Sequence, residues 1–136
     1  MIVGEWGGFG GYMDIDEHCN FLLDTFDRNS WSFTYWAWVS GDFRAIKLLQ
    51  RDYPKAVAGD LISYHYDPDS GSFSMEWDAA SIPDAPTVVC IPKGLDGRTV
   101  EITPSASYEE GDIDGTPHLF IQTKKTGRHS VIIRNQ

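Results

Sequence analysis

The order of strand-like and helix-like segments in the first fifty residues most restricts the fold of this 136-residue chain. Residues 2–6 form a short apolar run, and residues 31–38 alternate in the manner of a strand. Between them, apolar side chains recur at helical spacing over residues 15–26, and Asp14 begins a capping-box pattern. A second helix is expected over residues 43–51. Strands that alternate with helices favour a parallel α/β arrangement.

A single carboxylate, Glu5, lies near the end of the first strand-like run, and Trp36 and Trp38 share one face of the second. A sugar-processing site uses an acid beside aromatic rings. The apolar face of a pyranose stacks on the rings, while the carboxylate attacks or protonates the anomeric centre. Residue types alone favour the alternative, in which Glu5 is a solvated acid and the tryptophans belong to the core.

The pattern changes in the second half of the chain. Residues 61–66 and 72–77 alternate on either side of a turn-rich segment, which predicts a hairpin. Further strands are expected over residues 87–91, 99–103, 119–123 and 129–134. Six short strands separated by glycine, proline and aspartate turns indicate an antiparallel β-sandwich.

Composition excludes several classes of partner. The net charge of −9 disfavours nucleic acid, because phosphate binding needs clustered Lys and Arg. No run approaches the roughly 20 apolar residues of a membrane span. The acidic segment 109–115 is expected to be a solvated loop, and the four histidines show no ligand spacing, so we assign neither metal nor cofactor.

Cys19 and Cys90 are expected to be reduced, buried thiols, because both have apolar neighbours. No basic or signal-like segment precedes the first strand, so the sequence assigns no compartment. If the chain is a fragment of a larger protein, that protein could still be secreted.

Several of these segments resemble a known family. Gly4-Glu5-Trp6-Gly7, a helix, Tyr35-Trp36-Ala37-Trp38 and the Tyr53-Pro54 junction are similar, in this order, to the C-terminal part of glycoside hydrolase family 5 enzymes. The similarity is greatest to the endoglycoceramidase and glucosylceramidase-like branch, whose retaining (β/α)8 barrels are followed by a β-sandwich. The resemblance implies that residues 1–53 are the last two βα units of a barrel and that residues 54–136 are the sandwich domain.

By the same resemblance, Glu5 is the catalytic nucleophile and Trp36 stacks beneath the sugar, with Trp38 as the second choice. From their residue types, Trp6, Trp38 and Phe9 would line an approach for an apolar aglycone such as ceramide or sterol, in a substrate such as a glycosylceramide. Retaining hydrolysis needs two carboxyl groups about 5–5.5 Å apart. The family's asparagine-glutamate pair, which supplies the second group, has no counterpart here, so the chain alone is expected to be inactive.

Three hypotheses remain for the chain as a whole. It is the C-terminal portion of a family 5 glycosidase, a small glycosidase completed by self-association or a partner chain, or a carbohydrate-binding or scaffold sandwich without catalysis. We favour the first, because two βα units cannot close a barrel and leave strand edges unpaired. A carbohydrate or glycolipid is the expected ligand, and the expected partner is the missing barrel portion or a second copy of this chain.

Overall fold

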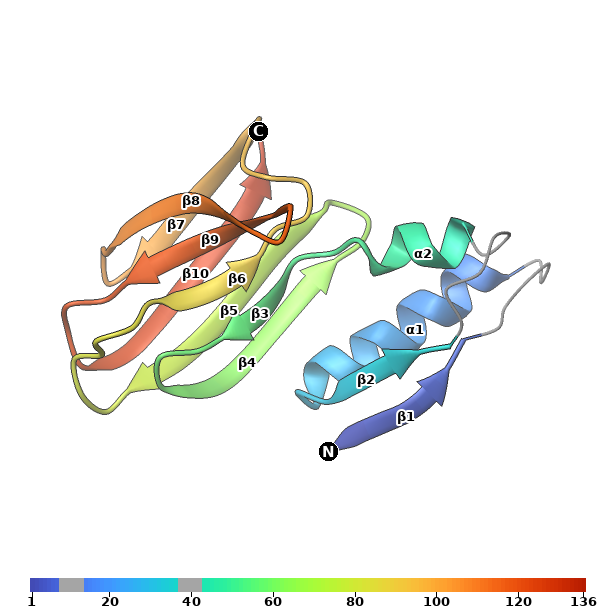
Figure 1. Cartoon of the computed structure of the whole chain (residues 1–136), viewed down its shortest axis with the longest axis horizontal. Coiled ribbons are helices and arrows are strands. Elements are labelled where there is room, and N and C mark those ends of the chain that lie inside the picture. Colours follow the sequence, from blue (N-terminus) through green and yellow to red (C-terminus); the bar gives the residue numbers. More distant parts are fainter. Residues whose placement is uncertain (8–13, 37–42) are drawn as a thin grey trace. The chain divides into compact units, whose positions relative to one another are not determined.

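The structure, a computed structural model, describes residues 1–7, 14–36 and 43–136 (Figure 1). It divides the chain into two compact units, Met1–Gln50 and Arg51–Gln136. Tyr53, which was expected to end the first unit, belongs to the first strand of the second. None of the helices in the described ranges is long and apolar enough to cross a membrane.

The first unit contains two strands and two helices in alternation. They are β1 (Ile2–Trp6), α1 (Ile15–Arg28), β2 (Ser32–Tyr35) and α2 (Phe43–Leu49). β1 and β2 pair in parallel, as the alternation of strands and helices predicts. A parallel pair needs a crossover connection, which here contains α1. Two strands alone do not establish a barrel, and the barrel origin of this unit stays a prediction.

The two ends of α1 differ in how closely they follow the sequence pattern. Asp14 is the N-cap residue, but its side chain makes no capping hydrogen bond, so the expected capping box is not formed. At the other end, the amide of Ser30 donates to the carbonyl of Asp27 (3.0 Å), and that of Trp31 to Phe26 (2.9 Å). These two bonds form a Schellman motif, in which Ser30 adopts a φ of 50°. The helix therefore ends where the sequence predicts.

The second unit is an antiparallel β-sandwich, which confirms the expected fold of this half. Its strands are β3 (Tyr53–Ala56), β4 (Asp60–Asp67), β5 (Ser72–Ala79), β6 (Thr87–Cys90), β7 (Arg98–Thr103), β8 (Ser107–Ile113), β9 (Thr116–Gln122) and β10 (Gly127–Asn135). One sheet has the order β4-β5-β10-β7 and the other β3-β6-β9-β8. In Figure 1 the second sheet lies in front of the first.

The core of the sandwich consists of side chains from the inner faces of both sheets. The fully or nearly buried members are Tyr66, Phe73, Met75, Trp77, Val89, Ile91, Leu119, Ile121, Val131 and Ile133. Trp77 is completely buried and stacks on the imidazole of His129, with 5.3 Å between ring centroids. Burying an aromatic side chain of this size makes one of the largest single contributions to a core.

The turn between β4 and β5 is built by side chains of its own residues. The carboxylate of Asp67 accepts hydrogen bonds from the amide of Asp69 (2.9 Å) and the hydroxyl of Ser70 (2.6 Å). Gly71 follows with a φ of 66°, a conformation that favours glycine. The expected hairpin is therefore present, with a turn of the kind that Asp and Ser side chains stabilise.

The sequence does not predict two of the strands, β3 and β8. β3 contains Pro54 and lies at an edge of its sheet, where a strand tolerates a residue without an amide hydrogen. β8 lies at the opposite edge and replaces the solvated loop expected over residues 109–115. Most of its side chains are exposed, so it lacks the apolar alternation that marks a half-buried strand.

A buried ion pair links the start of the sandwich to β7. The guanidinium of Arg98 donates to both carboxylate oxygens of Asp52 and to the carbonyls of Gly71 and Gly94. The Arg98 and Asp52 side chains are only 5% and 2% exposed. Burial raises the pKa of Asp52 above its usual range, while the hydrogen bonds and charge of Arg98 oppose that rise. Each member is therefore tolerated in the interior because the other is present.

Replacing Asp52 should destabilise the sandwich strongly. In Asp52→Asn the buried guanidinium of Arg98 loses its counter-charge, and we expect the free energy of unfolding to fall by about 3–5 kcal/mol. The matched control is Arg128→Gln, which breaks an ion pair with Glu76 whose side chains are 64% and 42% exposed. Exposed pairs contribute about 0–1 kcal/mol. Equilibrium urea unfolding measures both, and equal losses would contradict the assigned role of burial.

Candidate active site

α1 packs against one face of the β1–β2 pair. Trp6 and Tyr35 are register partners, and both pack against the buried residues Ile15 and Cys19 of α1. Side chains alternate between the two faces of a strand. The neighbours of Trp6 and Tyr35 along each strand therefore point away from the helix.

Glu5 and Trp36 lie on this second face, at the carboxyl ends of β1 and β2. Glu5 pairs with Thr34, and both residues are exposed. Trp36 directly follows Tyr35 and is 61% exposed. Its amide donates to the carbonyl of Trp6 (2.7 Å), so the parallel ladder continues one residue beyond β2. An acid and an aromatic residue thus occupy adjacent strand ends on one face, and their roles stay a prediction.

An irregularity at Gly4 determines the direction in which Glu5 points. The register partners are Val3 with Phe33 and Glu5 with Thr34, so Gly4 is an extra residue in β1. Without this bulge, Val3 and Glu5 would share a face, because they are two positions apart. Instead Val3 is half-buried and Glu5 is exposed. Bulges often re-aim a side chain beside an active site.

Gly7 lets the two strand ends approach closely. It has a φ of 129°, and a β-carbon at this position would lie 2.3 Å from the carbonyl oxygen of Trp36 and 2.8 Å from the Tyr35 ring. Any side chain would therefore force the backbone of β1 away from that of β2. This contact depends on the pairing of β1 with β2, so the sequence alone does not reveal it.

Trp6 packs in the layer between the strands and α1. Its ring makes edge-to-face contacts with Phe26, Phe33 and Tyr35, at centroid distances of 5.3, 5.4 and 5.4 Å. For Trp6, this packing corresponds to the alternative in which the tryptophans belong to the core. A contact between Trp6 and an aglycone stays a prediction, and Phe9 and Trp38 lie outside the described residues.

The described residues hold no group of three or more His, Cys, Asp or Glu side chains that could bind a metal ion. The Glu5 face presents one exposed carboxylate beside the exposed ring of Trp36.

Comparison with protein families gives a match over most of the second unit. Residues 51–133 match the glycoside hydrolase family 5 C-terminal domain. The chain belongs to this family. The match covers the sandwich, whereas Glu5 and Trp36 lie outside it. A comparison with curated protein sequences gave no match.

Solved structures of two other proteins resemble the chain over both of its units. Endo-glycoceramidase II from Rhodococcus sp. has a TM-score of 0.77 and 18% sequence identity, covering 99% of this chain and 33% of its own. Sterylglucosidase 1 from Cryptococcus neoformans has a TM-score of 0.74 and 16% identity, covering 99% of this chain and 29% of its own. The chain thus spans about a third of the length of these proteins. Other solved structures of the endo-glycoceramidase contain a lactosyl-enzyme intermediate or a complex with ganglioside GM3.

Substituting Gly7 should loosen the junction between β1 and β2. Gly7→Ala combines an unfavourable φ with a clash against the Trp36 carbonyl, so we expect a loss of more than about 1 kcal/mol in local stability. Hydrogen exchange of the Trp36 amide reports this directly, because that amide bonds to Trp6 across the pair. Gly4→Ala is the control, since a β-carbon there meets nothing within 4 Å. Equal protection of the Trp36 amide in both variants would contradict the prediction.

Proposed function

We propose that this chain is the C-terminal part of a retaining β-glycoside hydrolase in which Glu5 is the nucleophile and Trp36 stacks beneath the sugar. The observation that supports this assignment is the shared face of Glu5 and Trp36 at the carboxyl ends of two parallel strands. In (β/α)8 barrels, catalytic residues project from the carboxyl ends of the strands, and the helices pack on the outside. The face of β1–β2 opposite α1 would then line the interior of the barrel.

In the proposed reaction a carboxylate oxygen of Glu5 attacks the anomeric carbon. A glycosyl ester forms, the bond to the aglycone oxygen breaks, and that oxygen takes a proton from a second carboxylic acid. The second group then removes a proton from water, which attacks the anomeric carbon and releases Glu5. Trp36 would hold the apolar face of the sugar during both steps.

The acid/base residue has to come from outside this chain. The same holds for the strands that would complete a barrel, because β1 and β2 form a sheet of only two strands among the described residues. We therefore propose that the chain acts together with the remaining barrel strands and that it has no glycosidase activity alone.

The proposed substrate is a β-glycoside with a lipid aglycone. The structural neighbours that support this choice are an endo-glycoceramidase, whose structures include a ganglioside complex, and a sterylglucosidase. Ceramide and sterol aglycones are both large and apolar. Comparing the hydrolysis of substrates with different aglycones tests this choice most directly.

The nucleophile assignment can be tested in a chimera. This chain replaces the matching C-terminal third of Rhodococcus endo-glycoceramidase II, and release of sugar from an aryl β-lactoside and from lactosylceramide is measured. We expect a folded chimera to be active and Glu5→Gln to abolish the activity, because an amide cannot form the glycosyl ester. Glu101→Gln, an exposed acid of the sandwich, is the control and should remain active.

Chemical rescue separates a nucleophile from an acid that merely positions the substrate. In a Glu5→Gly chimera with an activated aryl glycoside, added azide should restore turnover and yield the α-glycosyl azide. The small anion enters the space of the missing carboxylate and attacks the same face of the sugar. Full activity of Glu5→Gln, or no rescue by azide in a folded Glu5→Gly chimera, would contradict the assignment.

Loss of the stacking ring should weaken sugar recognition without removing the chemistry. For Trp36→Ala in the same chimera we expect kcat/KM to fall roughly tenfold, which corresponds to about 1.4 kcal/mol. Trp36→Phe, which keeps an aromatic face, should recover part of the loss. The control is Phe21→Ala on α1, where the side chain is also exposed, at 66%. Equal effects of Trp36→Ala and Phe21→Ala would contradict the stacking role.

A further inference from the structure

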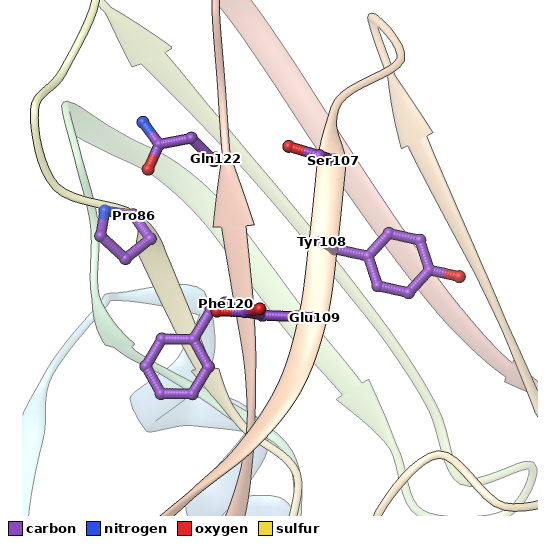
Figure 2. A pocket seen from close by; sticks show the side chains of 6 residues that line it. All are labelled: Pro86, Ser107, Tyr108, Glu109, Phe120 and Gln122. Atoms are coloured by element: carbon purple, nitrogen blue, oxygen red, sulfur yellow. The ribbon is translucent and has the colours of Figure 1, made fainter.

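A pocket of about 370 Å³ lies on the sheet β3-β6-β9-β8, far along the chain from Glu5. Its lining combines apolar and polar side chains: Pro86, Ser107, Tyr108, Glu109, Phe120 and Gln122 (Figure 2). Its volume falls within the usual range of small-molecule sites, about 300–1,000 Å³. All of its lining residues belong to the second unit.

The strand register places four of these side chains on the outer face of the sheet. Ser107 is opposite Gln122, and Glu109 is opposite Phe120. The residue between them on β9, Ile121, is completely buried in the sandwich core. Because side chains alternate, its two neighbours point outward. Figure 2 shows the side chain of Tyr108, the partner of Ile121, pointing away from the other five residues.

The ring of Phe120 lies beside Gly111 of β8, in the space that a side chain at this position would fill. A β-carbon on Gly111 would lie 2.8 Å from Cε2 of Phe120, so only glycine leaves room for the ring. Pro86, which immediately precedes β6, supplies a second rigid apolar surface beside β9. Phe120 is only half-buried, so part of its ring remains open to a ligand.

Polar groups stand around these apolar surfaces. The side-chain amide of Gln122 donates to the carbonyl of Pro83 (3.1 Å), which fixes the amide and leaves its oxygen as an acceptor. Among the described residues, the carboxylate of Glu109 and the hydroxyl of Ser107 form no hydrogen bond or ion pair with another side chain. The pocket thus offers a carboxylate, an amide and a hydroxyl beside an aromatic ring.

We infer that this pocket binds a neutral sugar ring, so that the sandwich is itself a carbohydrate-binding module. A pyranose presents an apolar face that stacks on an aromatic ring, and an edge of hydroxyl groups that are both donors and acceptors. Phe120 matches the apolar face, and the carboxylate of Glu109 accepts two neighbouring hydroxyls in charge-assisted hydrogen bonds. The inference does not depend on the proposed hydrolase, because Glu5 and Trp36 take no part in the pocket.

The charges of the pocket exclude anionic ligands in favour of neutral ones. No Lys or Arg is among its lining residues, and Glu109 is the charged residue among them. A phosphate or carboxylate placed against Phe120 would meet Glu109 without a compensating cation. A neutral glycan meets no such repulsion.

A second pocket, of about 330 Å³, adjoins the first and extends the site. Both are lined by Ser107 and Gln122, and the second adds Lys124 and Lys125 as hydrogen-bond donors. A ligand longer than one sugar ring can therefore reach from the Phe120 pocket toward the lysines. We expect an oligosaccharide to bind more tightly than a monosaccharide.

The test is a titration of the ¹⁵N-labelled full chain with glucose, lactose and cellotetraose, followed by amide chemical shifts. Binding in the millimolar range should move the amides of Glu109, Phe120 and Gln122, and cellotetraose should bind more tightly than glucose. Phe120→Leu keeps an apolar side chain but removes the flat ring, and should reduce the affinity at least tenfold. Phe120→Tyr keeps the ring and should retain binding.

Matched variants on β8 test the polar contacts. Glu109→Gln weakens the charge-assisted hydrogen bonds and should reduce the affinity severalfold. Glu110→Gln is the control, because this exposed neighbour lies on the opposite side of the same strand and should leave the affinity unchanged. Glu5→Gln and Trp36→Ala should also leave it unchanged, which distinguishes this site from the proposed active site.

Several results would overturn the inference. One is the absence of shifts at Glu109 and Phe120 up to the highest soluble concentration of each sugar. Another is sugar binding that survives Phe120→Leu but disappears in Trp36→Ala. A third is an extended peptide, rather than a sugar, that shifts the amides along β8, which would show that the sheet edge is the binding surface.

Discussion

The first unit is governed by the parallel pairing of β1 with β2, because the crossover helix of such a pair covers one face. α1 packs on the side of Trp6 and Tyr35. Glu5 and Trp36 are left on the other side, at strand ends. The same constraint explains why an isolated parallel pair is an unusual structure, since parallel sheets are normally covered on both faces. The face that carries the proposed chemistry is therefore also the face that the proposed barrel would enclose.

The sandwich needs no such completion. Its inner faces bury one continuous apolar cluster that includes Trp77, Phe73 and Ile121. The ion pair of Asp52 with Arg98 links the start of this unit to β7. This difference agrees with the extent of the family match, which covers residues 51–133 and not the first fifty. A module that folds by itself can bind a ligand whether or not a catalytic partner is present.

Sequence patterns predicted most elements of both units because their apolar residues have a clear period. The alternation in residues 72–77 and the helical spacing from Ile15 to Phe26 are examples. The patterns did not reveal features that depend on pairing between strands. The bulge at Gly4 changes the face of Glu5, yet a glycine in a short run has several possible roles. The sugar pocket was missed because Phe120 and Glu109 meet only once β8 is recognised as a strand.

The edges of the two units differ in a way that bears on production of the protein. β8, an edge strand of the sandwich, carries Glu109, Glu110 and Asp112, and such charges discourage strands of other molecules from pairing with it. β1 offers little of this protection, since Ile2 is 75% exposed and Glu5 is its only charged side chain. If this protein aggregates at high concentration, the first intermolecular contacts should therefore form along β1, while the sandwich stays folded.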